Sequence, residues 1–206
     1  QQGTNVHLIF ATSGKAGRVN SSATDTEKIT SEQESLKQES QKASTLLQVA
    51  STTFLDFPDN RLDTISRMDI SLAIKSLLTN IQPNIVFTHH HGDYNWDHNI
   101  ISEASMMACR PNLGEQFPQT ILGYEVLSST ERAFQTPQQM FCPTVFVDIA
   151  ATLEIKKQAM RCYLSELHDY PHPRSIKGIE ILAQKRGLET GLLAAESFSL
   201  IRHIQS

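Results

Sequence analysis

Short apolar runs alternate along this chain with longer segments in which apolar residues recur at helical spacing. Residues 6–12, 52–57 and 84–88 are runs of strand length, rich in branched and aromatic side chains. Each is followed by a segment with a helical pattern. These segments are residues 32–47, 65–78 and 99–110. The alternation predicts a mostly parallel sheet covered by helices, because parallel neighbours need a crossover connection.

The second half of the chain continues the pattern less regularly. Strands are expected at residues 121–127, 144–149 and 196–201, and helices at 151–167 and 176–186, the latter ending at Gly187. Residues 13–31 are rich in Gly, Ser, Thr and Asn and predict a long polar loop. The expected fold class is therefore α/β, with a mostly parallel sheet.

One polar stretch stands out from this pattern. Residues 89–98, HHHGDYNWDH, contain four histidines and two aspartates and are called the histidine loop below. The loop follows an expected strand and precedes an expected helix, which is where ligands bind in open α/β sheets. Its density of imidazole and carboxylate groups predicts a metal site.

Composition narrows the class of partner. The chain has 206 residues, a formal net charge of -4 and 39% hydrophobic residues, with no block of basic side chains. These values favour one globular domain that binds a small molecule and argue against nucleic acid, which needs clustered Lys and Arg. No stretch is apolar enough to predict a membrane span. Three cysteines without CxxC spacing indicate a reducing, cytoplasmic compartment.

Two zinc motifs can be laid on the histidine loop. His89, His91 and Asp93 fit the HxHxDH motif of metallo-β-lactamase-like hydrolases, but Tyr94 stands where that motif has its last histidine. The other motif is the Asp97-His98 pair at the start of a helix. A solvated polar loop without metal is a third alternative.

The Asp97-His98 motif belongs to an ordered set of segments. They are VHLIFATSGKAGR, FLDFPDNRLD, THHHGDYNWDH, YEVLSST, PTVFVDIAATLEIKKQAMRCYLSE, YPHPRS and AAESFSLIR. In this order the chain resembles the LmbE-like (PIG-L) family of zinc-dependent N-deacetylases. The resemblance covers nearly all of residues 1–206.

The resemblance implies a Rossmann-like three-layer sandwich and a role for several loop residues. His98 would be a ligand of Zn²⁺ or another divalent metal, and Asp97 a carboxylate beside the metal, unless it only caps the helix. Asn95 replaces a histidine that many members use to stabilise the oxyanion; its amide can donate a hydrogen bond but cannot act as an acid. His90 or His91 would supply a second polarising group, or would be ordinary surface histidines.

The family's first metal motif, Ala-His-Pro-Asp-Asp-Glu, does not occur in the sequence. In the family it supplies two zinc ligands and the general base after the first strand. The resemblance therefore implies that residues 1–206 form a single domain that is truncated at its amino end and lacks the first strand.

Four further residues are candidates for substrate binding. Asp59 falls where the family has a substrate-binding carboxylate, Arg174 could reach a sugar or phosphate, and Arg18 and His172 are weaker candidates. A turn role for Asp59 and an ion pair for Arg174 are the alternatives. The implied reaction is deacetylation of an N-acetylated amino sugar of the GlcNAc type or its conjugate. A non-catalytic remnant or sugar-binding domain is the second possibility, and a homo-oligomer is left open.

Overall fold

The computed structural model describes residues 3–12, 14 and 23–205, with only the backbone of residues 23–30. The chain forms two compact units: residues 1–61 with 149–183, and residues 62–148 with 184–206. Arg18 lies outside the described residues. Among the described helices, none combines the length and apolar character needed to cross a membrane.

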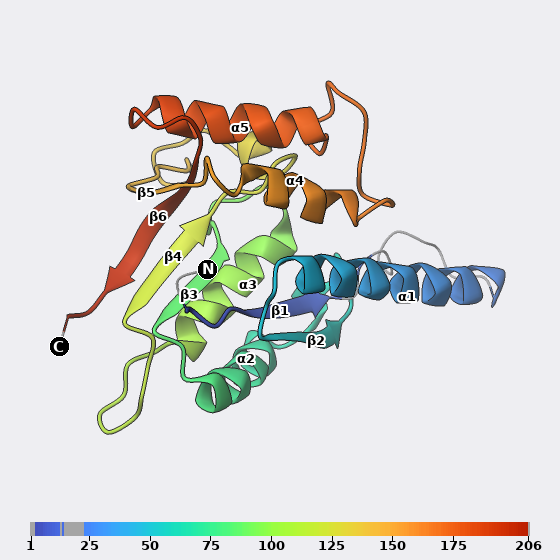
Figure 1. The fold of residues 1–206 in the computed structure, drawn as a ribbon. Helices are drawn as coiled ribbons and strands as arrows, with labels where there is room; N and C mark the ends of the chain where they lie inside the picture. Colours follow the sequence, from blue (N-terminus) through green and yellow to red (C-terminus); the bar gives the residue numbers. More distant parts are fainter. Residues whose placement is uncertain (1–2, 13, 15–22, 206) are drawn as a thin grey trace. The chain divides into compact units, whose positions relative to one another are not determined.

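The first unit contains a two-stranded parallel sheet. Its elements are β1 (His7–Thr12), α1 (Ala23–Leu46), β2 (Ser51–Phe57) and α4 (Leu153–Arg161). α1 packs against β2 and α4 (Figure 1). Ala43 of α1 is buried. Phe10 and Phe54 stack across the strand pair with ring centroids 5.0 Å apart. None of the six residues of β1 is fully buried, although the strand is largely apolar. A parallel strand is ordinarily covered on both faces, so β1 is under-protected within this unit.

The second unit contains a four-stranded mixed sheet in the order β3-β4-β6-β5 (Figure 1). Its strands are β3 (Ile85–His89), β4 (Thr120–Tyr124), β5 (Val145–Asp148) and β6 (Ala195–His203), and its main helices are α2 (Arg67–Ile81) and α3 (Trp96–Ala108). α2 and α3 pack on each other, and α3 also contacts β3. Leu62, Ile70 and Ile121 are completely buried and form the centre of this unit's core. Short 3-10 turns lie at η2 (Leu62–Thr64) and η3 (Thr130–Arg132), and α5 (Ile176–Leu188) begins in the first unit and ends in the second.

The prediction of an α/β fold is confirmed, but the prediction of one mostly parallel sheet is wrong. β1 pairs with β2 and β3 with β4 in parallel, whereas β4 with β6 and β5 with β6 are antiparallel. The described residues thus form two separate sheets, one of them mixed. The segment between β4 and β5 contains only the three-residue η3. β5 has one neighbour in the sheet, β6, and two helices, α4 and α5, connect these strands. A single crossover helix returns the chain to a parallel neighbour, whereas this longer connection brings the chain into β6 in the antiparallel direction.

Most expected elements are present within a few residues, but α1 and α4 differ more, and α5 does not stop at Gly187 as expected. α1 begins at Ala23, inside the expected loop. Its first turns were not predicted, because a polar helix segment has no apolar periodicity in its sequence. α4 ends at Arg161, and the following chain turns back until the amide of His168 donates to the carbonyl of Arg174. α5 runs through Gly187 to Leu188. A Cβ at Gly187 would lie 2.5 Å from the carbonyl oxygen of Leu192, so this glycine permits close backbone approach.

Candidate functional site

The histidine loop begins at the carboxyl end of β3 and leads into α3. β3 lies parallel to β4, with His89 opposite Tyr124 in the register, and the amide of His90 extends the pairing by donating to the carbonyl of Tyr124 at 3.0 Å. The predicted strand-loop-helix context of the loop is confirmed. The end of a parallel strand pair therefore presents the loop's side chains at one edge of the sheet.

Asn95 caps the first turn of α3. Its side-chain oxygen accepts a hydrogen bond from the amide of Asp97 at 2.9 Å. The alternative that Asp97 is the cap is therefore wrong. Asp97 is buried instead, and its Oδ1 accepts from the amide of Leu62 at 3.2 Å. Because Asn95 uses its oxygen for the helix, the amide nitrogen is the group that it retains for other partners.

Asp93 is the most heavily hydrogen-bonded side chain of the loop. Its fully buried carboxylate accepts from His98 Nδ1 at 3.0 Å, from the amide of Asn95 at 2.9 Å, from Thr130 Oγ1 at 2.6 Å and from Ser129 Oγ. Burial alone would raise the pKa of Asp93, but these hydrogen bonds outweigh it and hold the pKa well below its usual range. Asp93 is therefore a charged acceptor at neutral pH.

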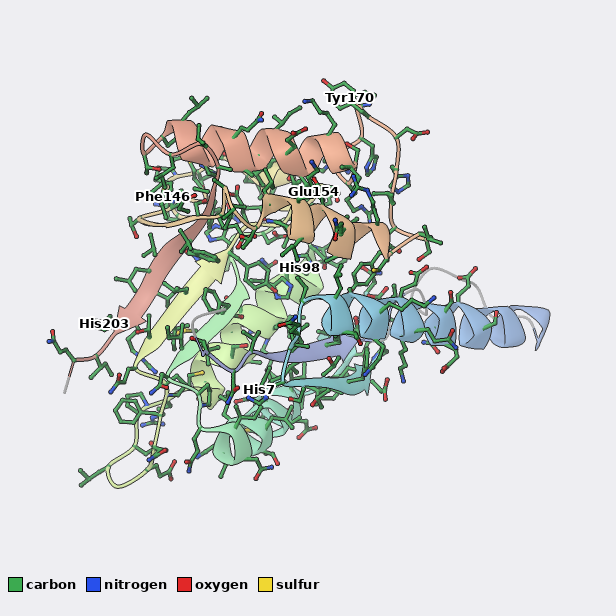
Figure 2. All side chains as sticks on the ribbon, viewed as in Figure 1. His7, His98, Phe146, Glu154, Tyr170 and His203 are labelled. Carbon is green, nitrogen blue, oxygen red and sulfur yellow. The ribbon has the colours of Figure 1, made fainter. Side chains whose placement is uncertain are left out.

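His98, labelled in Figure 2, lies in the first turn of α3. Its side chain is 20% exposed. Because the Asp93 carboxylate can only accept, His98 carries its proton on Nδ1 when neutral, and Nε2 keeps a free lone pair. This carboxylate–imidazole arrangement is the one that commonly orients a metal-binding histidine.

His89 stacks on His98. The ring centroids are 4.2 Å apart at an interplanar angle of 22°, and Tyr124 Oη lies 3.0 Å from His89 Nε2. Burial, helped by the nearby His98 and opposed by Asp93, lowers the pKa of His89 to about 3. Burial, with the charge of Asp93, raises the pKa of Tyr124 well above its usual range. Both groups are therefore neutral near pH 7, and His98 rests on an uncharged aromatic surface.

His90 and His91 are bound to a neighbouring segment. Their Nε2 atoms donate to the carbonyls of Gln139 at 2.8 Å and Gln138 at 2.9 Å, respectively. A Cβ at Gly92 would lie 2.3 Å from the Gln139 carbonyl oxygen, so only glycine allows the two segments to approach so closely. Burial, more than the opposing hydrogen bond to Gln139, lowers the pKa of His90. These bonds direct both rings toward backbone carbonyls, and their predicted catalytic role stays a prediction.

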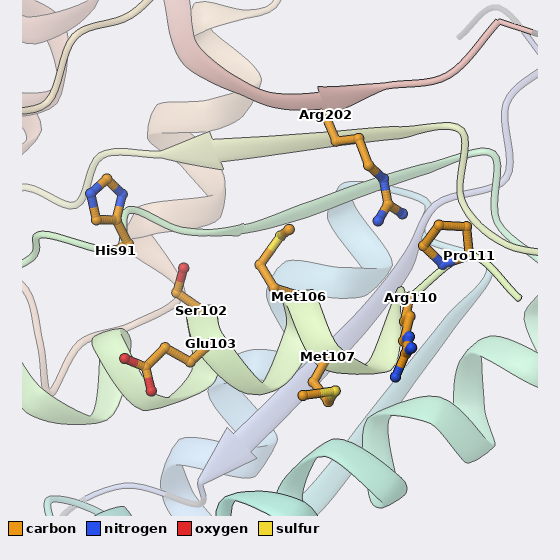
Figure 3. A pocket seen from close by; sticks show the side chains of 8 residues that line it. All are labelled: His91, Ser102, Glu103, Met106, Met107, Arg110, Pro111 and Arg202. Atoms are coloured by element: carbon orange, nitrogen blue, oxygen red, sulfur yellow. The ribbon is translucent and has the colours of Figure 1, made fainter.

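A shallow pocket of about 400 Å³ lies along α3 (Figure 3). Met106, Met107 and other α3 side chains line it, together with Arg202 of β6 and His91. His98 is not part of its lining. Of the predicted catalytic residues the pocket thus includes His91, and the Asp93–His98 pair lies outside it.

Whether the second unit can bind a zinc ion depends on how many metal-ligating side chains it brings together. A catalytic zinc site takes three protein ligands and leaves a position for water. His98, held by Asp93, fits the role of one ligand. Among the residues that the structure describes, however, no group of three or more His, Cys, Asp or Glu side chains is arranged to hold a metal ion. The described residues therefore do not form a complete zinc site.

The remaining candidates lie in the first unit. Asp59 follows β2 and accepts from Thr12 Oγ1 at 3.2 Å and from Asn60 Nδ2 at 2.7 Å. Arg174 forms an ion pair with Glu166, and its amide donates to His172 Nδ1 at 3.0 Å. Asp59 thus lies at the carboxyl ends of β1 and β2, while Arg174 and His172 are joined in the segment before α5. Their predicted substrate contacts stay predictions.

Sequence reasoning named His89 and Asp93 as possible metal ligands but did not identify them as contacts of His98. In the sequence, Asp93 is visible only as part of a motif. Its position five residues before His98, with a loop and a helix start between them, is the signal that could have indicated their hydrogen bond. His89 is visible as the last residue of an expected strand. Tyr124, Ser129 and Thr130 come from β4 and the segment after it, and nothing local in the sequence connects them with the loop.

Solved structures share the fold of this chain at low identity. The conserved protein TT1542 from Thermus thermophilus is 20% identical, with a TM-score of 0.71 over 100% of this chain and 85% of that one. The N,N'-diacetylchitobiose deacetylase from Pyrococcus horikoshii is 19% identical, with a TM-score of 0.72 over 97% and 73% of the two chains. GalB, the 4-carboxy-2-hydroxymuconate hydratase from Pseudomonas putida, is 17% identical, with a TM-score of 0.73 over 100% and 87%. One fold thus accompanies both a deacetylase and a hydratase, so the fold does not fix the reaction.

Sequence comparison is more specific. No curated protein sequence matches the chain. The family model described as PIG-L, GlcNAc-PI de-N-acetylase, matches residues 1–109, a stretch that contains β1, β2, β3 and α3 with the whole histidine loop. The match covers more than half of the 206 residues. The chain therefore belongs to the PIG-L family.

Proposed function

We propose that this chain contributes to a zinc-dependent N-deacetylase that removes the acetyl group from an N-acetylated amino sugar of the GlcNAc type or its conjugate. The observation that carries the proposal is the Asp93–His98 pair at the start of α3, in a chain of the PIG-L family. The pair holds one imidazole in the tautomer that a metal ligand needs. The diacetylchitobiose deacetylase with a similar fold supports an N-acetylated sugar as the substrate class.

The residues of the chain have defined roles in this proposal. His98 supplies one metal ligand, and Asp93 orients it. Asp97, buried beside the cap of α3, is the second carboxylate of the site. The side-chain N–H of Asn95 donates a hydrogen bond to the oxyanion that forms when the acetyl carbonyl is attacked. Because the described residues lack a complete ligand set, no reaction step through the metal is assigned to this chain alone.

The substrate is proposed to be held by Asp59 and Arg174. A carboxylate accepts hydrogen bonds from sugar hydroxyls, and a guanidinium can bind hydroxyl, carbonyl or phosphate oxygens through its planar fork. Arg174 is already paired with Glu166, so its guanidinium is oriented before a ligand arrives. Arg18 and His172 remain the weaker candidates of this group.

The proposal is tested by comparing two proteins: the 206-residue chain, and the same chain preceded by a strand and a His-Pro-Asp-Asp segment of the family type. Bound zinc is measured by metal analysis, and acetate release from N-acetylglucosamine-type amides by a coupled assay. We expect the short form to be metal-poor and inactive, because its described residues lack a three-ligand group. We also expect it to be prone to associate, because Val6 is 48% exposed and no residue of β1 is fully buried. The longer form should gain zinc, turnover and a monomeric state together.

Two further variants make the test specific. In the longer form, His98→Ala should abolish stoichiometric zinc binding, whereas the control His203→Ala should not. His203 is an exposed residue of β6 whose side chain hydrogen-bonds to Thr120. Thr120 and Tyr124 are the first and last residues of β4 that pair with β6, so this control lies away from Tyr124. Stoichiometric zinc with full turnover in the short form would show that the histidine loop assembles a site by itself, and the proposed ligand set would be wrong.

A sugar-binding domain without catalysis is the second candidate. The lack of a three-ligand group among the described residues favours it for the isolated chain. Calorimetric titration with N-acetylglucosamine in the presence of a chelator separates the two functions: binding without acetate release in the longer form would favour this candidate.

A further inference from the structure

We propose that His89, held in place by Tyr124, is a positioning residue that fixes the ring plane of His98. The inference rests on the proposed role of His98 as a metal ligand, and it adds a residue that acts on this ligand through a contact separate from the bond to Asp93. All four side chains belong to the second unit.

The hydrogen bond to Asp93 constrains His98 incompletely. It ties one ring nitrogen to Oδ1 at 3.0 Å, but a single hydrogen bond tolerates bending, so coupled changes of the two side-chain torsions of His98 can still rotate the ring. Such a rotation would carry Nε2 out of its position while the hydrogen bond persisted. A second contact on the ring face is needed to remove this freedom.

The face contact comes from His89. Its ring lies 4.2 Å from that of His98, centroid to centroid, and the two planes differ by 22°. This near-parallel stack resists rotation of the His98 plane, which would bring ring edges into the space that His89 fills. An edge bond to Asp93 and a face contact with His89 together define both the position and the tilt of the imidazole.

His89 can serve as a reference because it is itself held by the backbone and by a neighbouring side chain. It is the last residue of β3 and pairs with Tyr124 of β4 through the backbone. The Tyr124 hydroxyl lies 3.0 Å from His89 Nε2, and the two rings are 4.9 Å apart. The sheet therefore fixes the orientation of the His89 ring. Through the ring stack, it also fixes the orientation of the His98 ring, which belongs to α3.

The experiment uses the 206-residue chain with isotope-labelled histidine and without metal. Ring-to-ring nuclear Overhauser effects between residues 89 and 98, and the side-chain rotamer populations of His98 from scalar couplings, report the orientation directly. His89→Ala should lower the ratio of the ordered His98 ring to other rotamers about 2- to 12-fold, the range that an aromatic stack contributes. His203→Ala, the exposed control on β6, should leave the ratio unchanged.

Rescue distinguishes positioning from general support of the fold. His89→Phe keeps a flat ring without its nitrogens and should keep the His98 ratio within about twofold of the original. Tyr124→Phe removes only the hydroxyl that holds His89, so it tests the proposal even if His89→Ala does not fold. It should lower the ratio measurably, but less than His89→Ala.

An unchanged His98 ratio in His89→Ala or in Tyr124→Phe overturns the proposal, and so does a loss that His89→Phe fails to restore. These outcomes are independent of zinc and acetate. An ordered His98 that depends on His89, in a protein whose longer form releases no acetate, would uphold the positioning role while refuting the deacetylase function.

Discussion

Replacing Asp93 with Asn should destabilise the second unit more than any exposed change of the same kind. The carboxylate accepts four hydrogen bonds, and its side chain has no solvent exposure. An amide loses the negative charge and turns one acceptor oxygen into a donor, so at least one of the buried hydroxyls of Ser129 and Thr130 must reorient or lose its acceptor. A hydrogen bond to a charged group contributes about 1.5–3 kcal/mol, and a stranded buried polar group costs about 1–3 kcal/mol.

Because these terms share partners and are not additive, we expect a loss of about 3 kcal/mol in the free energy of unfolding. With a urea dependence of about 2 kcal/mol per molar, the unfolding midpoint should fall by about 1.5 M. The assay is urea unfolding followed by circular dichroism, because Trp96, the single tryptophan, is already 77% exposed in the folded chain.

Asp169→Asn is the matched control, because it makes the same chemical change on an exposed residue. Its stability should stay within about 0.5 kcal/mol of the original. Equal midpoints for the two variants would show that the four bonds to Asp93 contribute nothing net, and the argument that Asp93 organises the loop would fail.

Cysteine reactivity, a buried ion pair and substrate affinity supply three further tests. Burial raises the pKa of Cys109 to about 11, against the opposing charge of a nearby arginine, so at pH 8 iodoacetamide should label the other two cysteines first; equal labelling of all three would contradict its burial. Its protonated thiol contributes stability below pH 9.0 that is lost as the pH rises toward 11. Arg186→Gln should lower the free energy of unfolding by about 3–5 kcal/mol, because it leaves the shielded Glu125 carboxylate without its partner. Lys185→Gln, at an exposed residue, should lower it by under about 1 kcal/mol; both values are measured by urea unfolding. Arg174→Ala in an active longer form should raise the KM for the sugar more than the zinc dissociation constant; unchanged kinetics would make Arg174 a structural ion-pair residue.

Element positions were readable from the sequence where an apolar pattern existed. The strand at β3 and the helices α2 and α3 agree within a few residues, because each has an apolar face that packs on a neighbour. The first turns of α1 were missed because their residues are polar. The apolar pattern could not predict the order and direction of the strands. These depend on which strands pair across long distances in the sequence, such as β4 with β6.

The candidate site could be located from the sequence, but its internal order could not be predicted. The motif spacing indicates His98 as the first residue to test, and the strand-loop-helix context places it at a strand end. The resemblance implies that Asp97, the residue before His98 in the sequence, is a carboxylate beside the metal. The observed partner of the His98 ring is Asp93, since the side chain of Asp97 bonds to the amide of Leu62. Adjacency in sequence is a poor guide in the first helical turn, where neighbouring side chains point in directions about 100° apart.

The three consecutive histidines show why a metal motif cannot be read from spacing alone. Successive residues at the end of a strand face opposite sides, so His89 and His90 enter different environments although their side chains are identical. His89 faces His98 and Tyr124, while His90 lies against Phe141 and bonds to a backbone carbonyl. His91 bonds to another carbonyl, so the HxH pair that spacing suggests has its two rings committed to different partners. What each ring already contacts therefore bears on the ligand set proposed for this loop. The Nδ1 of His98 donates to Asp93, which leaves its Nε2 as the ring nitrogen for the proposed metal.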